Sequence, residues 1–130
     1  MVYLIDTNII IRFLVGDNEE FLQQSTEIFQ NIENGTVQVE ILSEALMECY
    51  FVLTKFYKLP KNEVINDLKT ILSLQGVVNQ DKIILFETLN LIENKNIDFV
   101  DALICAKTKL QNYKSFKYFF ISKKTKTDYF

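Results

Sequence analysis

The stretch Val-Tyr-Leu-Ile-Asp-Thr-Asn, residues 2–8, opens with a short apolar run that leads directly into three polar residues. The apolar part, residues 2–5, contains β-branched members and predicts a buried strand of the kind found inside a parallel sheet. Asp6, Thr7 and Asn8 favour caps and turns and therefore end the strand. Asp6 thus falls at the carboxyl end of a strand, where open α/β sheets place their ligand sites. An Asp here is also a good N-cap, and the residue type alone does not separate the two roles.

Strand and helix patterns alternate along the rest of the chain. Apolar runs predict further strands at residues 36–39, 77–78 and 118–121. Apolar residues at helical spacing, with start and stop signals, predict helices at residues 9–15, 17–34, 42–57, 61–74, 81–93 and 98–111. This order predicts an α/β fold of three layers, with a mainly parallel central sheet flanked by helices. Because the sequence contains no repeat, low-complexity segment or linker, we expect one domain over residues 1–130.

The composition excludes several classes of chemistry. The 130 residues are 48% hydrophobic and carry a formal net charge of -3, which is unlike a disordered chain or a purely electrostatic binder. Histidine is absent, and this excludes Ser-His-Asp triads, Cys-His pairs and histidine-zinc sites. A metal site in this chain must therefore use oxygen ligands, which suits Mg²⁺ or Mn²⁺.

The sequence also predicts the cellular setting. The N-terminal apolar stretch contains Asp6, Asn8 and Arg12 and lacks the basic region of a signal peptide. No uncharged apolar run reaches the roughly 18 residues of a membrane span. Cys49 and Cys105 lie in apolar helical runs without metal-ligand spacing, which is typical of a reducing compartment. We expect a soluble, cytoplasmic protein with no membrane association.

Glu48 is a candidate ligand because its sequence neighbours are almost all apolar. A carboxylate in such surroundings is expected to be incompletely solvated and to need a charged partner. Burying a single unpaired ion costs on the order of several kcal/mol, even after the protein relaxes around it. Arg12 is the only arginine, so a metal is a candidate partner. The alternative is a narrow polar stripe, because Glu44 lies about 40° away around the same helix.

Asp98 and Asp101 begin the last long predicted helix. The helix dipole stabilises an acid near a helix N-terminus by about 0.3–1 kcal/mol, which gives both residues a purely structural role. For Asp98 we favour this role, as an N-cap. Asp101 is followed by small and apolar residues that indicate close packing, and a carboxylate held there can ligate a metal.

Asp6, Glu48 and Asp101 come from separate elements that can converge at one end of the sheet. Carboxylates that hold one metal, or two about 3.5–4 Å apart, can hydrolyse a phosphodiester without histidine.

Three sequence blocks resemble those of PIN-domain nucleases, especially the toxin ribonucleases of VapC type. The first is the opening stretch through Asp6-Thr7-Asn8. The second surrounds Glu48, which stands five residues before Leu53 and nine before Tyr57. The third is Ile-Asp-Phe-Val-Asp-Ala-Leu-Ile-Cys-Ala, residues 97–106. All three blocks occur in the family's order and spacing over essentially the whole chain.

The resemblance implies a PIN fold and endonucleolytic RNA cleavage with Mg²⁺ or Mn²⁺. It assigns the catalytic, metal-binding acids to Asp6, Glu48 and Asp101, and it selects Glu48 over Glu44. It implies helper roles for Asn8 and Asp98. Its toxin-type members imply a protein antitoxin and a homodimer, with the antitoxin received by the helices at residues 42–57 and 61–74.

One position departs from the family pattern. A fourth acid usually follows the last strand, and here Ser122 matches the Thr that precedes it, but Lys124 stands at the acid's place. Asp128 is the only acid left in the tail and would need a longer loop to replace it. The sequence therefore leaves open whether the site holds one metal or two, with Ser122 and Asp128 as further helpers.

Lysines concentrate near the C-terminal end, with seven between residues 107 and 126. Such a strip beside an acidic site suits a nuclease, since lysines follow the phosphate backbone. We predict RNA contacts at Arg12, Lys107, Lys123 and Lys124. The candidates for stacking on unpaired bases are Tyr113, Phe116 and Tyr129, although packing in the core is the alternative for these rings. A solvated helix face and tail would give the same charge pattern.

Three functions are compatible with these patterns. The first is a metal-dependent endoribonuclease, the toxin of a toxin–antitoxin pair. The second is a catalytically weakened PIN-fold module that binds RNA or a protein. The third is a phosphohydrolase acting on DNA flaps or small phosphate esters, which ranks last because the chain lacks additional helices for handling a flap.

Overall fold

Residues 1–113 are described by the computed structural model, and contacts within the chain divide it into two units at Lys82. The elements of the first unit are β1 (Val2–Leu4), α1 (Thr7–Val15), α2 (Glu19–Glu33), β2 (Gln38–Glu40), α3 (Ser43–Phe51), the π-helical turn η1 (Val52–Phe56) and α4 (Lys61–Leu72). The second contains α5 (Lys82–Lys95) and α6 (Phe99–Leu110). The predicted helices are therefore confirmed in order, with shifted ends, except that the helix predicted at residues 42–57 ends in the π-helical turn η1. The predicted strand at residues 118–121 lies outside the described residues.

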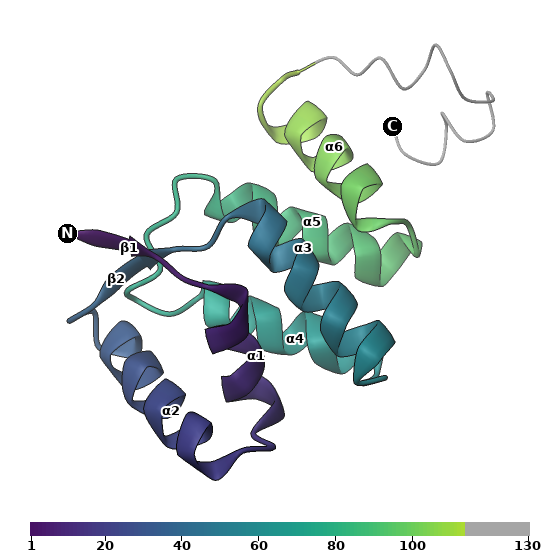
Figure 1. Cartoon of the computed structure of the whole chain (residues 1–130). Helices are drawn as coiled ribbons and strands as arrows, with labels where there is room; N and C mark the ends of the chain where they lie inside the picture. The colour runs from purple at the N-terminus through teal and green to yellow at the C-terminus, as the bar shows by residue number, and fades with distance from the viewer. Residues whose placement is uncertain (114–130) are drawn as a thin grey trace. The chain divides into compact units, whose positions relative to one another are not determined.

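The two strands of the first unit are parallel, as predicted. Val2 pairs with Gln38, Tyr3 with Val39 and Leu4 with Glu40, so β1 and β2 lie side by side (Figure 1). The connection between them passes through α1 and α2, which pack against each other. The segment predicted as a strand at residues 77–78 forms a single parallel bridge between Val77 and Val39. β2 therefore lies between β1 and this bridge.

The prediction that residues 2–5 form a buried strand is wrong for most of its length. Val2, Tyr3 and Leu4 are 47%, 55% and 64% exposed, and Ile5 is buried. The buried position belongs to Val39 at the centre of β2, which is paired on both sides. In residues 1–113, β1 pairs along one edge only, and an apolar run has the same sequence pattern on an edge strand as on a central one.

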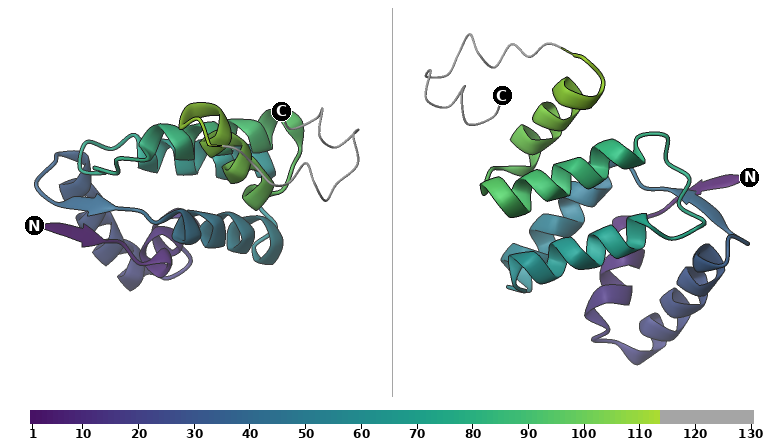
Figure 2. Two further views of the ribbon diagram at one scale, coloured as in Figure 1. Left: turned by 90° about the horizontal axis from the view of Figure 1, so that it is seen from above. Right: turned by 180° about the vertical axis from the view of Figure 1, so that it is seen from behind.

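The core of the first unit comes from one face of each helix. α1 packs on α3, and α3 packs on α4, as can be followed in the two further views of Figure 2. The helices begin and end at residues that suit these places: Asp6 and Asn18 accept hydrogen bonds at N-caps, and Gly16 ends α1 with a φ of 64°. Fully buried side chains of this core are Ile10, Ile32, Ile41, Leu46, Leu53, Ile65, Leu68 and Leu72.

Asn79 extends the parallel ladder with its side chain. Its Oδ1 accepts from the backbone N–H of Ile41 at 2.8 Å, and its Nδ2 donates to the Ile41 carbonyl at 2.7 Å and to Asp81 at 2.9 Å. The amide thus takes the place of a neighbouring strand for the residue that leads from β2 into α3. We call these hydrogen bonds between Asn79 and Ile41 the Asn79 clamp. They hold the backbone two residues before α3 begins.

Removing the clamp is expected to destabilise the fold. Asn79→Ala leaves the buried Ile41 N–H and carbonyl without this partner, which should lower the free energy of unfolding by about 1–3 kcal/mol. Urea denaturation measures the loss. Asn62→Ala, at an exposed position of α4, is the control and should change stability by less than about 0.5 kcal/mol. Equal effects of the two substitutions would contradict the structural role of the clamp.

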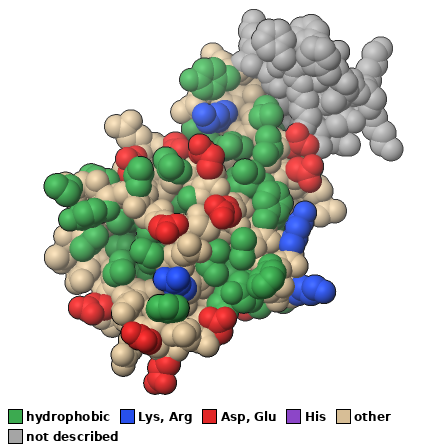
Figure 3. Space-filling model, viewed as in Figure 1, with side chains coloured by type: hydrophobic (Ala, Val, Ile, Leu, Met, Phe, Trp, Pro, Cys, Tyr) green, Lys and Arg blue, Asp and Glu red, His purple; other side chains and the backbone are tan. Residues whose placement is uncertain are grey.

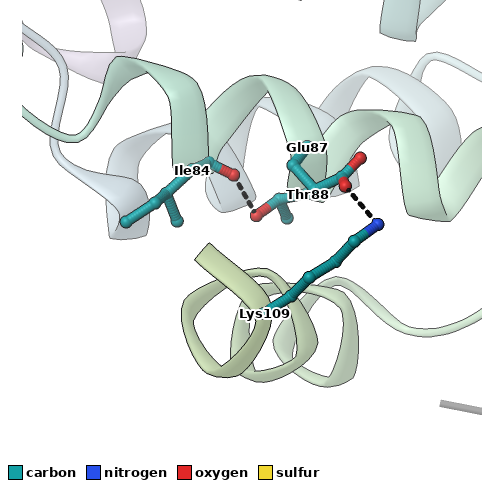
Figure 4. Close-up of polar contacts among 4 residues, drawn as sticks. All are labelled: Ile84, Glu87, Thr88 and Lys109. Carbon is teal, nitrogen blue, oxygen red and sulfur yellow. Dashed lines mark hydrogen bonds and ion pairs between the residues drawn. The ribbon is translucent and has the colours of Figure 1, made fainter. Parts of the chain in front are cut away.

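In the second unit, α5 and α6 are joined by a surface ion pair. Lys109 Nζ lies 2.9 Å from Glu87 Oε2 (Figure 4). The hydrogen bond and charge of Glu87 raise the pKa of Lys109 above its ordinary value. Beside this pair, the buried Thr88 donates its hydroxyl to the Ile84 carbonyl at 2.7 Å. One lysine of the predicted basic strip is therefore neutralised by a carboxylate of the neighbouring helix.

Within residues 1–113, no helix is long and apolar enough to cross a bilayer.

Candidate functional site

Asp6 stands where β1 passes into α1. Ile5 is buried and anchors the end of the strand, and its N–H donates to the Glu40 carbonyl at 3.2 Å. Asp6 follows as the N-cap of α1, with Oδ1 accepting from the Asn8 N–H at 3.4 Å, and its side chain is exposed. That hydrogen bond is long, so most of the acceptor capacity of the carboxylate still faces outward. Both interpretations of Asp6, as a cap and as an accessible carboxylate at a strand end, are compatible with this geometry.

Glu48 is brought to the same place by the packing of α1 on α3. The Thr7 hydroxyl donates to Glu48 Oε2 across 3.4 Å, and Thr7 directly follows Asp6. One residue further along α3, the buried Cys49 Sγ lies 3.9 Å from the Thr7 carbonyl. Figure 3 shows acidic side chains gathered over the start of α1 and over α3. Two carboxylates 42 positions apart in the sequence therefore share one surface.

The pKa of the Cys49 thiol is affected by the negative charge of this surface. Burial raises its pKa to about 12, and the negative charges of Glu48 and Asp6 add to the rise. Both carboxylates therefore act on the same sulfur atom from nearby. The thiol therefore stays protonated at neutral pH, which makes it a poor nucleophile.

The raised pKa predicts an unreactive cysteine. In EDTA, in a Cys105→Ser background, native Cys49 should be alkylated by iodoacetamide at least about tenfold more slowly than the unfolded chain at pH 8, because the thiolate is the reactive form. Quantifying the adduct by intact mass measures both rates. Since the folded pKa lies above the unfolded one, this group also lowers stability as pH rises from 9.0 toward about 12. Equal labelling of folded and unfolded protein would contradict the prediction.

The expectation that Glu48 is poorly solvated is wrong. Its side chain is exposed, as is that of Glu44 one turn earlier. The two acids form the polar stripe that was the alternative interpretation, while Leu46 and Cys49 carry the buried face. Apolar sequence neighbours do not imply burial on a helix, because adjacent residues point about 100° apart. Glu44 differs from Glu48 in its contact, accepting from the Ser43 hydroxyl at 2.8 Å.

Asp98 and Asp101 belong to the second unit. Asp98 occupies the N-cap position of α6, but its side chain makes no capping hydrogen bond, so the predicted capping by this side chain is wrong. An N-cap needs its carboxylate turned toward the N–H groups of the first turn, and backbone position alone does not ensure this. Asp101 is half-buried in the first turn of the helix. Its convergence with Asp6 and Glu48 stays a prediction, and the first 113 residues contain no cluster of three possible metal ligands.

The other predicted site residues fall into two groups. Asn8, Arg12 and Lys107 are exposed, and the Arg12 guanidinium of α1 lies 4.1 Å from the ring centroid of Phe21 on α2. Tyr113 is 60% exposed. The rest of the predicted RNA contacts, helpers and stacking residues lie outside the described part of the chain: Phe116, Ser122, Lys123, Lys124, Asp128 and Tyr129.

Thr7 is the residue that the sequence analysis treated only as a turn former. Its buried side chain joins the end of β1 to α3 through Glu48. The sequence signal was present as a β-branched hydroxyl residue at the first position of an apolar helix, but its partner is 41 positions away.

The donor set on this surface fits a hard divalent cation. Asp6 and Glu48 supply carboxylate oxygens, Thr7 and Asn8 supply neutral oxygens, and the neighbouring thiol is protonated. Mg²⁺ and Mn²⁺ favour carboxylate, carbonyl and water oxygens and are commonly bound through one or two carboxylates. The chemistry of these residues therefore suits the predicted metals.

Comparison with known proteins identifies the family. The PIN domain model matches residues 3–119, which contain all three candidate acids. No curated protein and no solved structure matches the chain significantly. Because the match covers nine-tenths of the sequence and the parallel strands and helices agree with it, the chain belongs to the PIN domain family.

Proposed function

We propose that this protein is a divalent-metal-dependent endoribonuclease. PIN domains are generally nucleases that use divalent metals, and the family match covers residues 3–119. The observation that carries the proposal is that Asp6 and Glu48 lie on one surface beside the end of β1, because the Thr7 hydroxyl next to Asp6 donates to Glu48 Oε2 and both carboxylates act on Cys49. Histidine is absent from the chain, so these carboxylates are its natural means of phosphodiester hydrolysis.

Each residue has a defined role in this proposal. Asp6 and Glu48 would hold the cation, Asp101 is the third ligand that the sequence resemblance assigns, and Thr7 orients Glu48 by donating to Oε2. The amide of Asn8, exposed on the first turn of α1, is available to a phosphate oxygen or a water. A bound cation supplies electrostatic stabilisation of the transition state and lowers the pKa of water. The chain's own contribution is to keep two carboxylates fixed on packed helices while leaving them accessible.

A circular RNA tests the endonucleolytic mode directly. Incubated with purified protein and Mn²⁺, the circle should be converted to a linear product of the same length, and EDTA should abolish the conversion. A linear RNA of the same sequence, with both ends free, is the matched substrate and should be cut at the same internal sites. Loss of the linear RNA alone would identify an exonuclease, and no loss of either RNA would contradict nuclease activity.

The toxin role is a further part of the proposal. We propose that the chain acts as the toxin of a toxin–antitoxin pair and forms a homodimer. A groove of about 360 Å³ in the first unit has a mixed lining, which suits an amphipathic segment of the antitoxin: Phe13, Phe29, Ile71 and Leu74 are apolar, and Thr26, Gln30, Glu33 and Thr70 are polar. Its lining includes α4, one of the two helices proposed from the sequence. Inducing the chain should arrest growth, and Glu48→Gln should relieve the arrest.

A catalytically weakened module is the second candidate. Lys124 stands where the family pattern has an acid, and the hydrogen bond that Glu48 accepts within residues 1–113 comes from the Thr7 hydroxyl. Calorimetry with Mn²⁺ separates the candidates. A Kd in the micromolar range that is lost in Asp6→Asn supports the nuclease, and no detectable heat combined with intact RNA binding supports the module.

A further inference from the structure

α3 does not end as an α-helix but passes into the π-helical turn η1, which carries a prominent aromatic residue. Phe56 is 75% exposed, more than any other large apolar side chain of residues 2–113. Its ring meets that of Tyr57 edge to face, with centroids 5.0 Å apart. The π turn is closed by the Tyr57 N–H donating to the Val52 carbonyl at 3.0 Å. π-helical turns are rare and frequently occur at functional sites.

The π turn changes the direction in which Phe56 leaves the helix. Eight residues of regular α-helix turn the chain by about 800°, which would leave Phe56 roughly 80° away from Glu48 around the helix. The i→i+5 turn η1 takes up one additional residue, which lowers the turn per residue and brings Phe56 toward the side of the helix that carries Glu48. Along the axis of a regular helix the two residues would be separated by about 12 Å. The irregular turn therefore moves an exposed ring toward the side of a proposed metal ligand.

Positive charge surrounds this ring. Lys55 and Lys58 flank Phe56 and are exposed, and residues 49–62 contain no acid. The Lys55 ammonium lies 4.8 Å from the Phe51 ring centroid, which holds its stem against the helix. Lys58 has a φ of 56°, the left-handed conformation in which helices commonly end, and it follows the C-cap residue of the π turn. We call Lys55, Phe56 and Lys58 the η1 patch.

We propose that the η1 patch binds the RNA strand next to the cleavage site, with a base stacked on Phe56 and phosphates held by Lys55 and Lys58. The proposal rests on the function proposed above and adds a substrate-binding site to it. An aromatic ring beside lysines is the usual combination for single-stranded nucleic acid. A separation of about 12 Å from Glu48 places the stacked base a few nucleotides from the phosphate being cut. The exposed face of the ring requires an unpaired base, so the site selects single-stranded RNA.

Binding is measured without cleavage, by fluorescence anisotropy of a labelled, unstructured 12-nucleotide RNA in EDTA. Phe56→Ala should raise the Kd about tenfold, and Phe56→Trp should restore or improve binding. Ile83→Ala, which removes another prominently exposed apolar side chain, is the control and should leave the Kd unchanged. Abasic positions throughout the RNA should eliminate the effect of Phe56→Ala, because no base is left to stack.

The lysines are tested through their salt dependence. Lys58→Gln should reduce the slope of log affinity against log salt by about 0.7, the value for one phosphate contact on a single strand. Lys95→Gln, at an exposed position of α5, is the matched control and should leave the slope unchanged.

The outcomes separate this inference from the proposed function. Mn²⁺-dependent cleavage with an unchanged Kd for Phe56→Ala would overturn the η1 patch and leave the nuclease intact. A tenfold weaker Kd for Phe56→Ala without any cleavage by the wild type would support the patch and overturn the nuclease. A change of oligomeric state in Phe56→Ala by sedimentation, with the Kd unchanged, would assign the patch to a protein interface and overturn the proposal.

Discussion

Glu48→Gln is expected to reduce the rate of Mn²⁺-dependent RNA cleavage by at least about 100-fold, equivalent to about 2.7 kcal/mol of transition-state stabilisation. The substitution removes the negative charge but keeps the shape of the side chain. The amide oxygen of Gln can still accept from the Thr7 hydroxyl, so α3 and the end of β1 should remain as they are. The Glu48 side chain is exposed, so no buried packing depends on it, and the substitution should leave the fold intact.

Glu44→Gln is the matched control for this experiment. Glu44 lies one turn earlier on α3, is also exposed, and loses the same charge on substitution. Its hydrogen bond is to Ser43 rather than to Thr7, so we expect cleavage within about twofold of the wild type. Calorimetry provides a second measurement, in which Glu48→Gln should weaken Mn²⁺ binding and Glu44→Gln should not. Equal losses of activity in both variants would reject the assignment of the site to Glu48.

Gly76→Ala is expected to lower the free energy of unfolding by about 3 kcal/mol, at the upper end of the effect of overpacking. A Cβ at this position would lie 2.2 Å from the Val37 carbonyl oxygen and 2.5 Å from that of Ile32. Both contacts are with backbone atoms, which cannot move aside as a flexible side chain can. The Gly76 N–H donates to the Ile32 carbonyl and its carbonyl accepts from Val39, each at 2.7 Å, so the close approach is part of the parallel bridge.

Gly16→Ala is the comparison for this substitution. Gly16 ends α1 with a φ of 64°, but a Cβ there would meet only the Leu22 side chain at 3.5 Å. The cost is then confined to the left-handed backbone, about 1–2 kcal/mol. Guanidinium denaturation of both variants measures the difference. A smaller loss for Gly76→Ala than for Gly16→Ala would show that the segment from β2 to Val77 can relax around an added methyl group.

Local patterns in the sequence were sufficient for most of the secondary structure. Apolar residues at helical spacing predicted each helix of residues 1–113, and Gly16 ended α1 where its freedom at positive φ is needed. The π turn at residues 52–56 was not predicted, because its residues continue the apolar pattern of α3. A change from i→i+4 to i→i+5 hydrogen bonds leaves no mark in composition or spacing.

The acids were identified from the sequence by their chemistry and by the resemblance to PIN domains, but their surroundings were not. Glu48 was expected among apolar neighbours and lies on an exposed stripe, because solvation depends on which face of α3 meets the core. Thr7 was overlooked because its partner is distant in the chain.

The sequence by itself determined the order of the strands and helices, the absence of histidine chemistry, and the carboxylates available to hold a cation. These properties depend on residue type and short-range spacing. Only the tertiary structure decided that β1 is exposed and paired along one edge within residues 1–113, that Asp6 and Glu48 share a surface beside Thr7, and that α3 continues into a π turn carrying the exposed Phe56. The physical reason is that the packing of faces depends on burial and on hydrogen bonds between residues about 40 positions apart, whereas the π turn depends on how the backbone of α3 winds at its end.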